Sequence, residues 1–186
     1  MISNDLIKDV SENCVQSFIH VSKTGAKNIR EFPIDCELLE DYNFIDITKS
    51  EKFGKLFADL KILSGPCLYF FTITSEHQTQ DLINDIVNYR LTGNAKSTPA
   101  IKKYIPESKI LYVGKVKRHL SGRIVQHLGF YKVTRTQGLQ LFYWTRNNKL
   151  KLNLTVLEFE NNMSDLMSVL EVELAKQLKP IIGKHR

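Results

Sequence analysis

The fold of this chain is read most directly from Leu111-Tyr112-Val113-Gly114-Lys115-Val116-Lys117-Arg118-His119-Leu120-Ser121-Gly122-Arg123-Ile124-Val125-Gln126-His127-Leu128. Its first residues alternate in apolar character and end at a glycine, which predicts a short strand and a tight turn. From Leu120 onward the apolar residues recur at helical spacing, which predicts a helix. We therefore expect a strand that runs directly into a helix.

One face of this predicted unit gathers cations and a phenol. Arg123 and His127 stand four residues apart, so they project from the same side of the helix. Tyr112, Lys115 and Lys117 lie just upstream, at the end of the strand and in the turn. An arginine offers a planar fork of donors, and a histidine can exchange protons near neutral pH. Such a face suits a phosphate group.

The residues Tyr112-Val113-Gly114 resemble the second motif of the GIY-YIG nuclease family, and Arg123 follows them as the family's arginine does. The spacing of Arg123 and His127 is similar to that of the restriction and homing endonuclease branches. Upstream, Gly65-Pro66-Cys67-Leu68-Tyr69 resembles the first motif of that family.

A third feature completes the resemblance. Glu171 lies nine residues before Pro180, as the acidic residue of the family's late helix does. The resemblance covers about residues 65 to 186, and it departs from the family in two ways. Tyr69 and Tyr112 are 43 residues apart, so an insertion at about residues 75–108 separates the first two strands of the domain. Gly183 stands where the family often has an asparagine.

The resemblance implies roles for the catalytic residues Tyr69, Tyr112, Arg123, His127 and Glu171. Tyr69 is expected to accept the proton of the attacking water, and Tyr112 to orient that water or the phosphate. Arg123 is expected to stabilise the charge of the transition state. Glu171 is the expected ligand of Mg²⁺, or of Mn²⁺ in its place, because Mg²⁺ needs few protein ligands and keeps most of its waters. His127 is expected to share the proton transfer or to bind a phosphate.

Three further cations, Lys115, Lys117 and Arg118, are the candidate substrate-binding residues. Charge is unevenly distributed along the chain: residues 1–93 hold 9 basic and 14 acidic residues, whereas residues 94–186 hold 17 basic and 6 acidic ones. A basic surface attracts polyanions. The expected partner is therefore DNA, with RNA left open.

The expected fold class is α/β (α+β), with a small central antiparallel sheet flanked by helices. Residues 1–62 are expected to form a helical N-terminal extension that docks on a nuclease domain of residues 63–186. No apolar run approaches the ~20 residues that span a membrane, and no signal-peptide pattern opens the sequence. We therefore expect a cytoplasmic protein without a membrane partner, and the sequence leaves its oligomeric state open.

Local patterns predict the individual elements. The stretch that follows Gly25, up to about residue 47, carries no clear pattern and is left unassigned. The residues Cys67 to Thr74 form the strongest strand pattern and should be central. The remaining expected elements are helices at residues 4–21, from Ser50 to about residue 62, at 79–91 and from Ser164 onward, and a hairpin of strands at 139–144 and 152–159.

The resemblance to the GIY-YIG family, together with the basic C-terminal half, thus implies a metal-dependent endonuclease that hydrolyses phosphodiester bonds in DNA, of a restriction-like or mobile-element type. An alternative of another class is a nucleic-acid-binding module of the same fold that is catalytically weak or inactive, or a subunit of a larger complex. Tyr69, Tyr112, Arg123 and Glu171 favour the enzyme. Gly183 and the long separation of the two tyrosines leave the alternative open.

Overall fold

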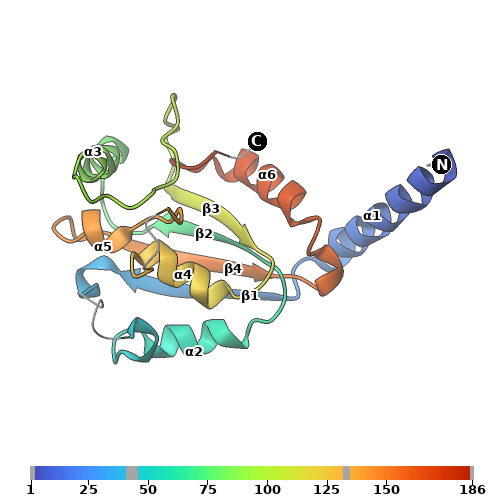
Figure 1. Ribbon diagram of the computed structural model, residues 1–186, viewed down its shortest axis with the longest axis horizontal. Coiled ribbons are helices and arrows are strands. Elements are labelled where there is room, and N and C mark those ends of the chain that lie inside the picture. Colours follow the sequence, from blue (N-terminus) through green and yellow to red (C-terminus); the bar gives the residue numbers. More distant parts are fainter. Residues whose placement is uncertain (1–2, 41–45, 132–134, 185–186) are drawn as a thin grey trace.

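A computed structural model describes residues 3–40, 46–131 and 135–184 of the chain. Its centre is a four-stranded antiparallel sheet with the strand order β1-β4-β2-β3, and helices lie on both of its faces (Figure 1). The strands are β1 (Asn28–Asp35), β2 (Cys67–Ile73), β3 (Ile110–Val116) and β4 (Lys151–Glu158). The helices are α1 (Asn4–Thr24), α2 (Gly54–Ile62), α3 (Thr79–Arg90), α4 (Leu120–Leu128), α5 (Leu141–Trp144) and α6 (Met167–Leu178).

Strand β2 lies between β4 and β3, which confirms its predicted central place. Successive side chains of a strand point to opposite faces of the sheet. Tyr69 and Phe71 accordingly join the larger core cluster, which also holds residues of α2, α3, α4 and α5. Leu68 joins a smaller cluster with Met163 and Met167, at the start of α6. The sheet therefore carries α6 on one face and the other core helices on the opposite face.

The helices at 79–91 and 120–128 and the strand at 111–114 are confirmed as α3, α4 and β3. The last predicted helix exists as α6 but begins at Met167, because Ser164 ends a short 3-10 turn, Asn161–Met163.

The predicted strand at residues 139–144 is wrong. Leu141 to Trp144 form the single helical turn α5, in which Leu141, Phe142 and Trp144 are all buried. The indole Nε1 of Trp144 donates a hydrogen bond to the carbonyl of Leu139 at 2.7 Å. A short apolar run fits a helix or a strand equally by periodicity, and packing decides between them. The expected hairpin with residues 152–159 is therefore absent, and β4 pairs with β1 and β2 instead.

The N-terminal part of the chain contains a strand that the sequence pattern did not indicate. Residues Asn28–Asp35 form β1, which pairs antiparallel with β4 along its whole length. Pro33 interrupts the pattern, and a proline is compatible with a strand at the edge of a sheet, where its missing N–H faces no neighbour. The expected helical extension therefore also supplies the outer strand of the sheet.

At the opposite edge, the C-terminal segment runs along β3. The amides of Ile181 and Ile182 donate to the carbonyls of Ile110 and Leu111 at 2.8 and 3.1 Å. Because β3 is an edge strand, side chains from both faces of the sheet can meet at this border. It is the border at which the candidate site lies.

The turn before β2 is held by a buried carboxylate. Glu158, the last residue of β4, accepts hydrogen bonds from the amides of Ser64 and Gly65 at 2.9 and 2.8 Å and from Asn28 Nδ2 at 2.6 Å. A Cβ atom on Gly65 would lie 2.4 Å from the carbonyl oxygen of Phe159, so only glycine allows this approach. Burial alone would raise the pKa of Glu158, but these hydrogen bonds outweigh it and hold the pKa below its usual range.

We expect Glu158→Gln to lower the free energy of unfolding by about 2 kcal/mol at pH 7, because hydrogen bonds to a charged acceptor are lost. The lowered pKa means that this stabilisation is present above the unfolded-state pKa and is lost as the pH falls through the folded-state pKa. Urea unfolding at several pH values would measure it. Glu160→Gln, at an exposed side chain with a surface ion pair to Lys27, is the control and should change little.

Candidate active site

The two tyrosines of the predicted motifs lie side by side in the sheet. Strands β2 and β3 pair so that Tyr69 faces Gly114 and Phe71 faces Tyr112. The ring centroids of Tyr69 and Tyr112 are 6.4 Å apart. Tyr69 is completely buried, whereas Tyr112 keeps a small exposed fraction of 9%. Residues 74–109, between the two strands, leave the sheet and return, and the two tyrosines still lie on paired strands.

Gly114 makes room for the ring of Tyr69. A Cβ atom at position 114 would lie 2.6 Å from both Cζ and Oη of Tyr69, and 2.8 Å from Cε1 of Tyr112. Real side chains never approach so closely, so any larger residue must displace one ring. The glycine of the second motif therefore has a steric role at the site itself.

We expect Gly114→Ala to destabilise the protein by about 1–3 kcal/mol, the usual cost of forcing a methyl group into a packed core. Thermal unfolding would measure this loss of stability. The added methyl group should also displace the Tyr69 ring and its hydroxyl. Gly122→Ala, on the exposed side of α4 with no atom near the added methyl group, is the matched control and should leave stability unchanged or raise it. Equal effects of the two substitutions would contradict the steric role.

Helix α4 presents Arg123 and His127 on one face, as their spacing predicts, and brings both side chains to the Tyr69 hydroxyl. Arg123 Nε donates to Tyr69 Oη at 3.1 Å, and His127 Nε2 lies 2.9 Å from the same oxygen. The amide of Leu139 donates to Nδ1 of His127 at 3.1 Å. Since Nδ1 accepts that bond, the proton of the neutral ring is on Nε2, which donates to Tyr69. Two donors thus converge on one phenol oxygen.

The guanidinium of Arg123 is fixed by further contacts. Its Nη1 donates to Gln126 Oε1 and to the carbonyl of Gln137, both at 2.7 Å. Nε is directed to Tyr69. Burial alone would lower the pKa of the guanidinium, but its interactions with Tyr69 and Tyr112 outweigh burial and raise that pKa. An arginine held in this way stays at a fixed position without further ordering when a substrate binds.

Burial controls the protonation states of this cluster. It raises the pKa of Tyr69 and of Tyr112, although the nearby Arg123 partly opposes the shift in both. It also lowers the pKa of His127 well below 6.5, and the charge of Arg123 acts in the same direction. At neutral pH both phenols are therefore protonated, His127 is neutral, and Arg123 carries the positive charge of the cluster.

Glu171 and Lys115 form an ion pair beside this cluster. Lys115, on β3, donates to Oε2 of Glu171, on α6, and the two side chains are only 32% and 14% exposed. Glu171 and Tyr112 both line a pocket of about 130 Å³ at the edge of the sheet. The other residues that line it are Pro99, Ala100, Gln137, Gly183 and Lys184. The pocket therefore brings together Glu171, a tyrosine of the second motif and the segment that contains Gly183.

The structure also shows where the remaining predicted residues, Lys117 and Arg118, lie. Lys117 Nζ donates to Asp165 at 2.5 Å in an exposed pair that lowers the pKa of Asp165. Arg118 is exposed on the turn before α4. Neither side chain lines the pocket with Glu171.

Sequence reasoning missed the loop that supports α4. Gln137 supplies a carbonyl to Arg123, and Leu139 supplies the amide that fixes the tautomer of His127. Gly138, between them, packs so closely on α4 that a Cβ atom would lie 2.5 Å from the carbonyl oxygen of Gln126. These contacts use main-chain atoms of residues distant from the motifs, and only the glycine gives a signal in the sequence.

A metal ion at this place would have one carboxylate from the protein. Within the described residues, no group of three or more His, Cys, Asp or Glu side chains could hold a metal ion. Glu171 in a polar pocket nevertheless fits Mg²⁺, which is commonly bound by one or two carboxylates together with water and substrate phosphate. Glu171 would then share its carboxylate between the ion and Lys115.

Comparisons with protein-family models, with curated proteins and with solved structures found no match to this chain. Among the described helices, none combines the length and the apolar character needed to cross a membrane.

Proposed function

We propose that this protein is a metal-dependent endonuclease of the GIY-YIG type that hydrolyses phosphodiester bonds in DNA. The observation that carries the proposal is the convergence of Arg123 and His127 on the hydroxyl of Tyr69, next to a pocket that Tyr112 and Glu171 line. Four elements, β2, β3, α4 and α6, supply these residues. Convergence of this kind, with strongly shifted pKa values, is typical of catalytic sites.

In the proposed reaction Arg123 neutralises the negative charge that develops on the phosphoryl oxygens. Tyr112, at the pocket, orients the phosphate or the attacking water. Glu171 would hold Mg²⁺, and the bound ion would supply positive charge beside the phosphate. Lys115 keeps the Glu171 carboxylate in place and adds a cation to the same region.

Tyr69 acts as its phenolate, which accepts the proton of the attacking water. The N–H groups of Arg123 and His127 both donate to its oxygen, so they stabilise that ionised form. His127, which is neutral in the structure, positions the phenol and does not need to carry a proton of its own. Tyr69 is fully buried in the structure, so this step requires that substrate binding opens a path for water to its oxygen.

This assignment predicts a cleavage rate that increases with pH. Because burial raises the pKa of Tyr69, its ionised fraction is small at neutral pH and grows about tenfold per pH unit below that pKa. Single-turnover cleavage measured between about pH 7 and about pH 9 should rise accordingly. A rate that falls over this interval would contradict a phenolate base.

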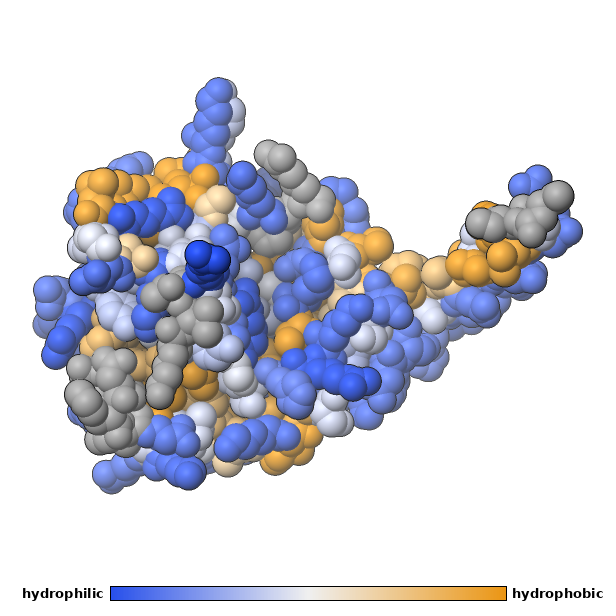
Figure 2. Space-filling view, viewed as in Figure 1, coloured by the Kyte–Doolittle hydropathy of each residue, from blue (hydrophilic) through white to orange (hydrophobic). Residues whose placement is uncertain are grey.

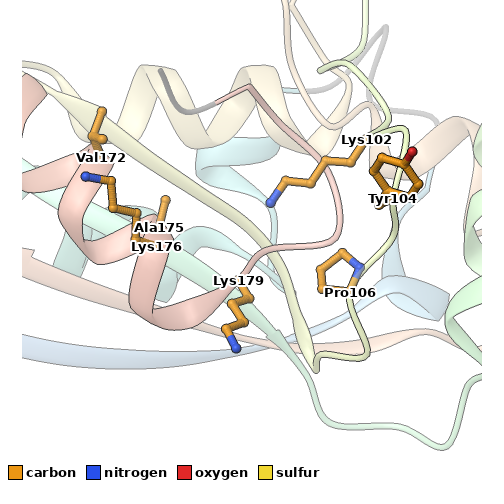
Figure 3. A pocket seen from close by; sticks show the side chains of 7 residues that line it. All are labelled: Lys102, Tyr104, Pro106, Val172, Ala175, Lys176 and Lys179. Atoms are coloured by element: carbon orange, nitrogen blue, oxygen red, sulfur yellow. The ribbon is translucent and has the colours of Figure 1, made fainter.

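A second pocket extends the basic surface beside the site. The loop residues Lys102, Tyr104 and Pro106 face Val172, Ala175, Lys176 and Lys179 of the α6 region across a pocket of about 280 Å³ (Figure 3). Partial burial lowers the pKa of Lys102. The pocket shares α6 with Glu171, so these lysines can contact phosphates that flank the one being cleaved. Salt should weaken such contacts steeply.

The proposal is tested by incubating the purified chain with supercoiled plasmid DNA in Mg²⁺ or in EDTA. We expect nicked and linear DNA in Mg²⁺ alone, and DNA binding that weakens as salt is raised. Salt-sensitive binding with no cleavage in Mg²⁺ or Mn²⁺ would favour the alternative, a binding module without turnover. Failure to bind DNA would reject both.

A further inference from the structure

Helix α1 presents an apolar surface that, along its N-terminal half, no residue described in the structure buries. It projects from one end of the sheet, and none of its residues, all of which the structure describes, is buried (Figure 1). Leu6, Ile7, Val10 and Val15 are each at least half exposed. A 21-residue helix is about 32 Å long at 1.5 Å per residue, so this surface is a substantial apolar area in contact with water.

Five of the apolar residues of α1 form a stripe that continues onto the body of the protein. Ile7, Val10, Cys14, Phe18 and Val21 recur every three or four residues, which places them on one side of a helix. The last two of them pack against the small core cluster that contains Phe159. Figure 2 shows hydrophobic residues along the projecting helix and where it joins the body.

At the base of α1 the stripe reaches an apolar groove. The groove has a volume of about 400 Å³ and lies between α1, the sheet and α6. Nearly all of its lining is apolar, with Ile29, Leu157, Phe159, Leu170 and Leu174 as its main walls. Stripe and groove together form one continuous surface of the kind that a protein partner covers.

We propose that the partner is a second copy of this chain, and that the two α1 helices pair antiparallel about a two-fold axis. Residues 4–13 of α1 carry three carboxylates, Asp5, Asp9 and Glu12, and one lysine. The other half of α1, residues 15–24, carries one lysine, Lys23, and a histidine, and no carboxylate. Antiparallel pairing places the acidic half of each helix against the basic half of the other, whereas parallel pairing would oppose like charges.

The stripe also specifies the register. Cys14 is the middle residue of α1 and lies on the stripe, so a two-fold axis at this position uses the helix along its full length. Val10 then faces Phe18 of the second copy, and Ile7 faces Val21 of the second copy. The N-terminal half of each α1 thereby covers the stripe at the base of the other and closes its groove.

This register brings the two Cys14 residues together. Packed helices lie about 8–10 Å apart and their Cα atoms lie about 2.3 Å from the helix axis, so facing Cα atoms are roughly 3.4–5.4 Å apart. That separation is compatible with a disulfide. Cys36 and Cys67 are buried, whereas Cys14 is partly exposed, so oxidation should cross-link the chains through Cys14.

The first test is the mass of the full chain in solution, measured by light scattering over concentrations up to about 100 µM. We expect twice the chain mass of 21.5 kDa. Val10→Glu places a charge in the contact twice and should raise the dimer dissociation constant at least about 100-fold. Gln16→Glu adds the same charge about 200° around the helix from Cys14 and should remain dimeric.

The second test is mild oxidation followed by electrophoresis without reductant. Wild-type protein should give a band of twice the chain mass, and Cys14→Ser should give none while remaining dimeric in solution. A monomer at every concentration would overturn the proposal. So would a dimer that is insensitive to Val10→Glu and not cross-linked through Cys14, or a monomer whose α1 binds lipid vesicles instead.

Discussion

Arg123→Ala should reduce DNA cleavage by about 10³-fold or more, the usual cost of removing a fixed group that stabilises transition-state charge. The guanidinium contacts Tyr69, Gln126 and Gln137 at once, so a smaller side chain removes both the charge and the position of the phenol. Arg123→Lys should recover little, because an ammonium cannot reproduce the planar fork. The measurement is single-turnover cleavage of a labelled duplex.

The control for charge is Arg146→Ala. Arg146 is an exposed arginine whose contact is with the ring of Phe142, away from the candidate site. Arg146→Ala removes one positive charge from the basic half of the chain, as Arg123→Ala does. A general electrostatic effect on DNA binding would therefore lower activity equally in both variants. Comparable losses would show that Arg123 acts through the overall field and not at the reacting phosphate.

Glu171→Gln should also lower cleavage by orders of magnitude, because it removes the negative charge that holds Mg²⁺ and keeps the size of the side chain. DNA binding should change little. The melting temperature should fall only modestly, because the amide keeps the size of the carboxylate and its oxygen can still accept a hydrogen bond from Lys115. Filter binding, thermal unfolding and cleavage would be measured on the same preparation.

Glu173→Gln is the matched control on the same helix. Glu173 lies two positions after Glu171, so its side chain points about 200° around the helix from that of Glu171. Its carboxylate pairs with Lys176 at 2.6 Å, and both side chains are exposed. This variant should keep wild-type activity. An inactive Glu173→Gln beside an active Glu171→Gln would show that the late helix is aligned wrongly with the family motif.

Two strands of the sheet and helix α4 could be predicted from local sequence patterns. Strands β2 and β3 and helix α4 were found because their apolar periodicity, glycines and lengths all favour one structure. The common face of Arg123 and His127 followed from the same patterns, whereas the adjacency of Tyr69 and Tyr112 was implied by the resemblance to the GIY-YIG family. The strand β1 was not found, since Pro33 interrupts it and its place at the sheet edge depends on β4.

The errors concern segments whose structure is decided by distant contacts. Leu141 to Trp144 are apolar enough for a strand, but the core takes them as one helical turn. The loop at Gln137 and Leu139 was missed for a related reason, because main-chain groups can hydrogen-bond from any residue type. The carboxylate of Glu158 gave no signal either, although it holds the turn that leads into β2.

The central claim is that Glu171 binds the metal ion and Arg123 stabilises the transition state of phosphodiester hydrolysis. It is tested most directly by titrating Mg²⁺ in a plasmid-cleavage assay with wild type, Glu171→Gln and Arg123→Ala. We predict that high Mg²⁺ partly restores Glu171→Gln, because weakened affinity is offset by concentration, and does not restore Arg123→Ala. Wild-type cleavage that persists in EDTA, or equal Mg²⁺ responses of wild type and Glu171→Gln, would contradict it.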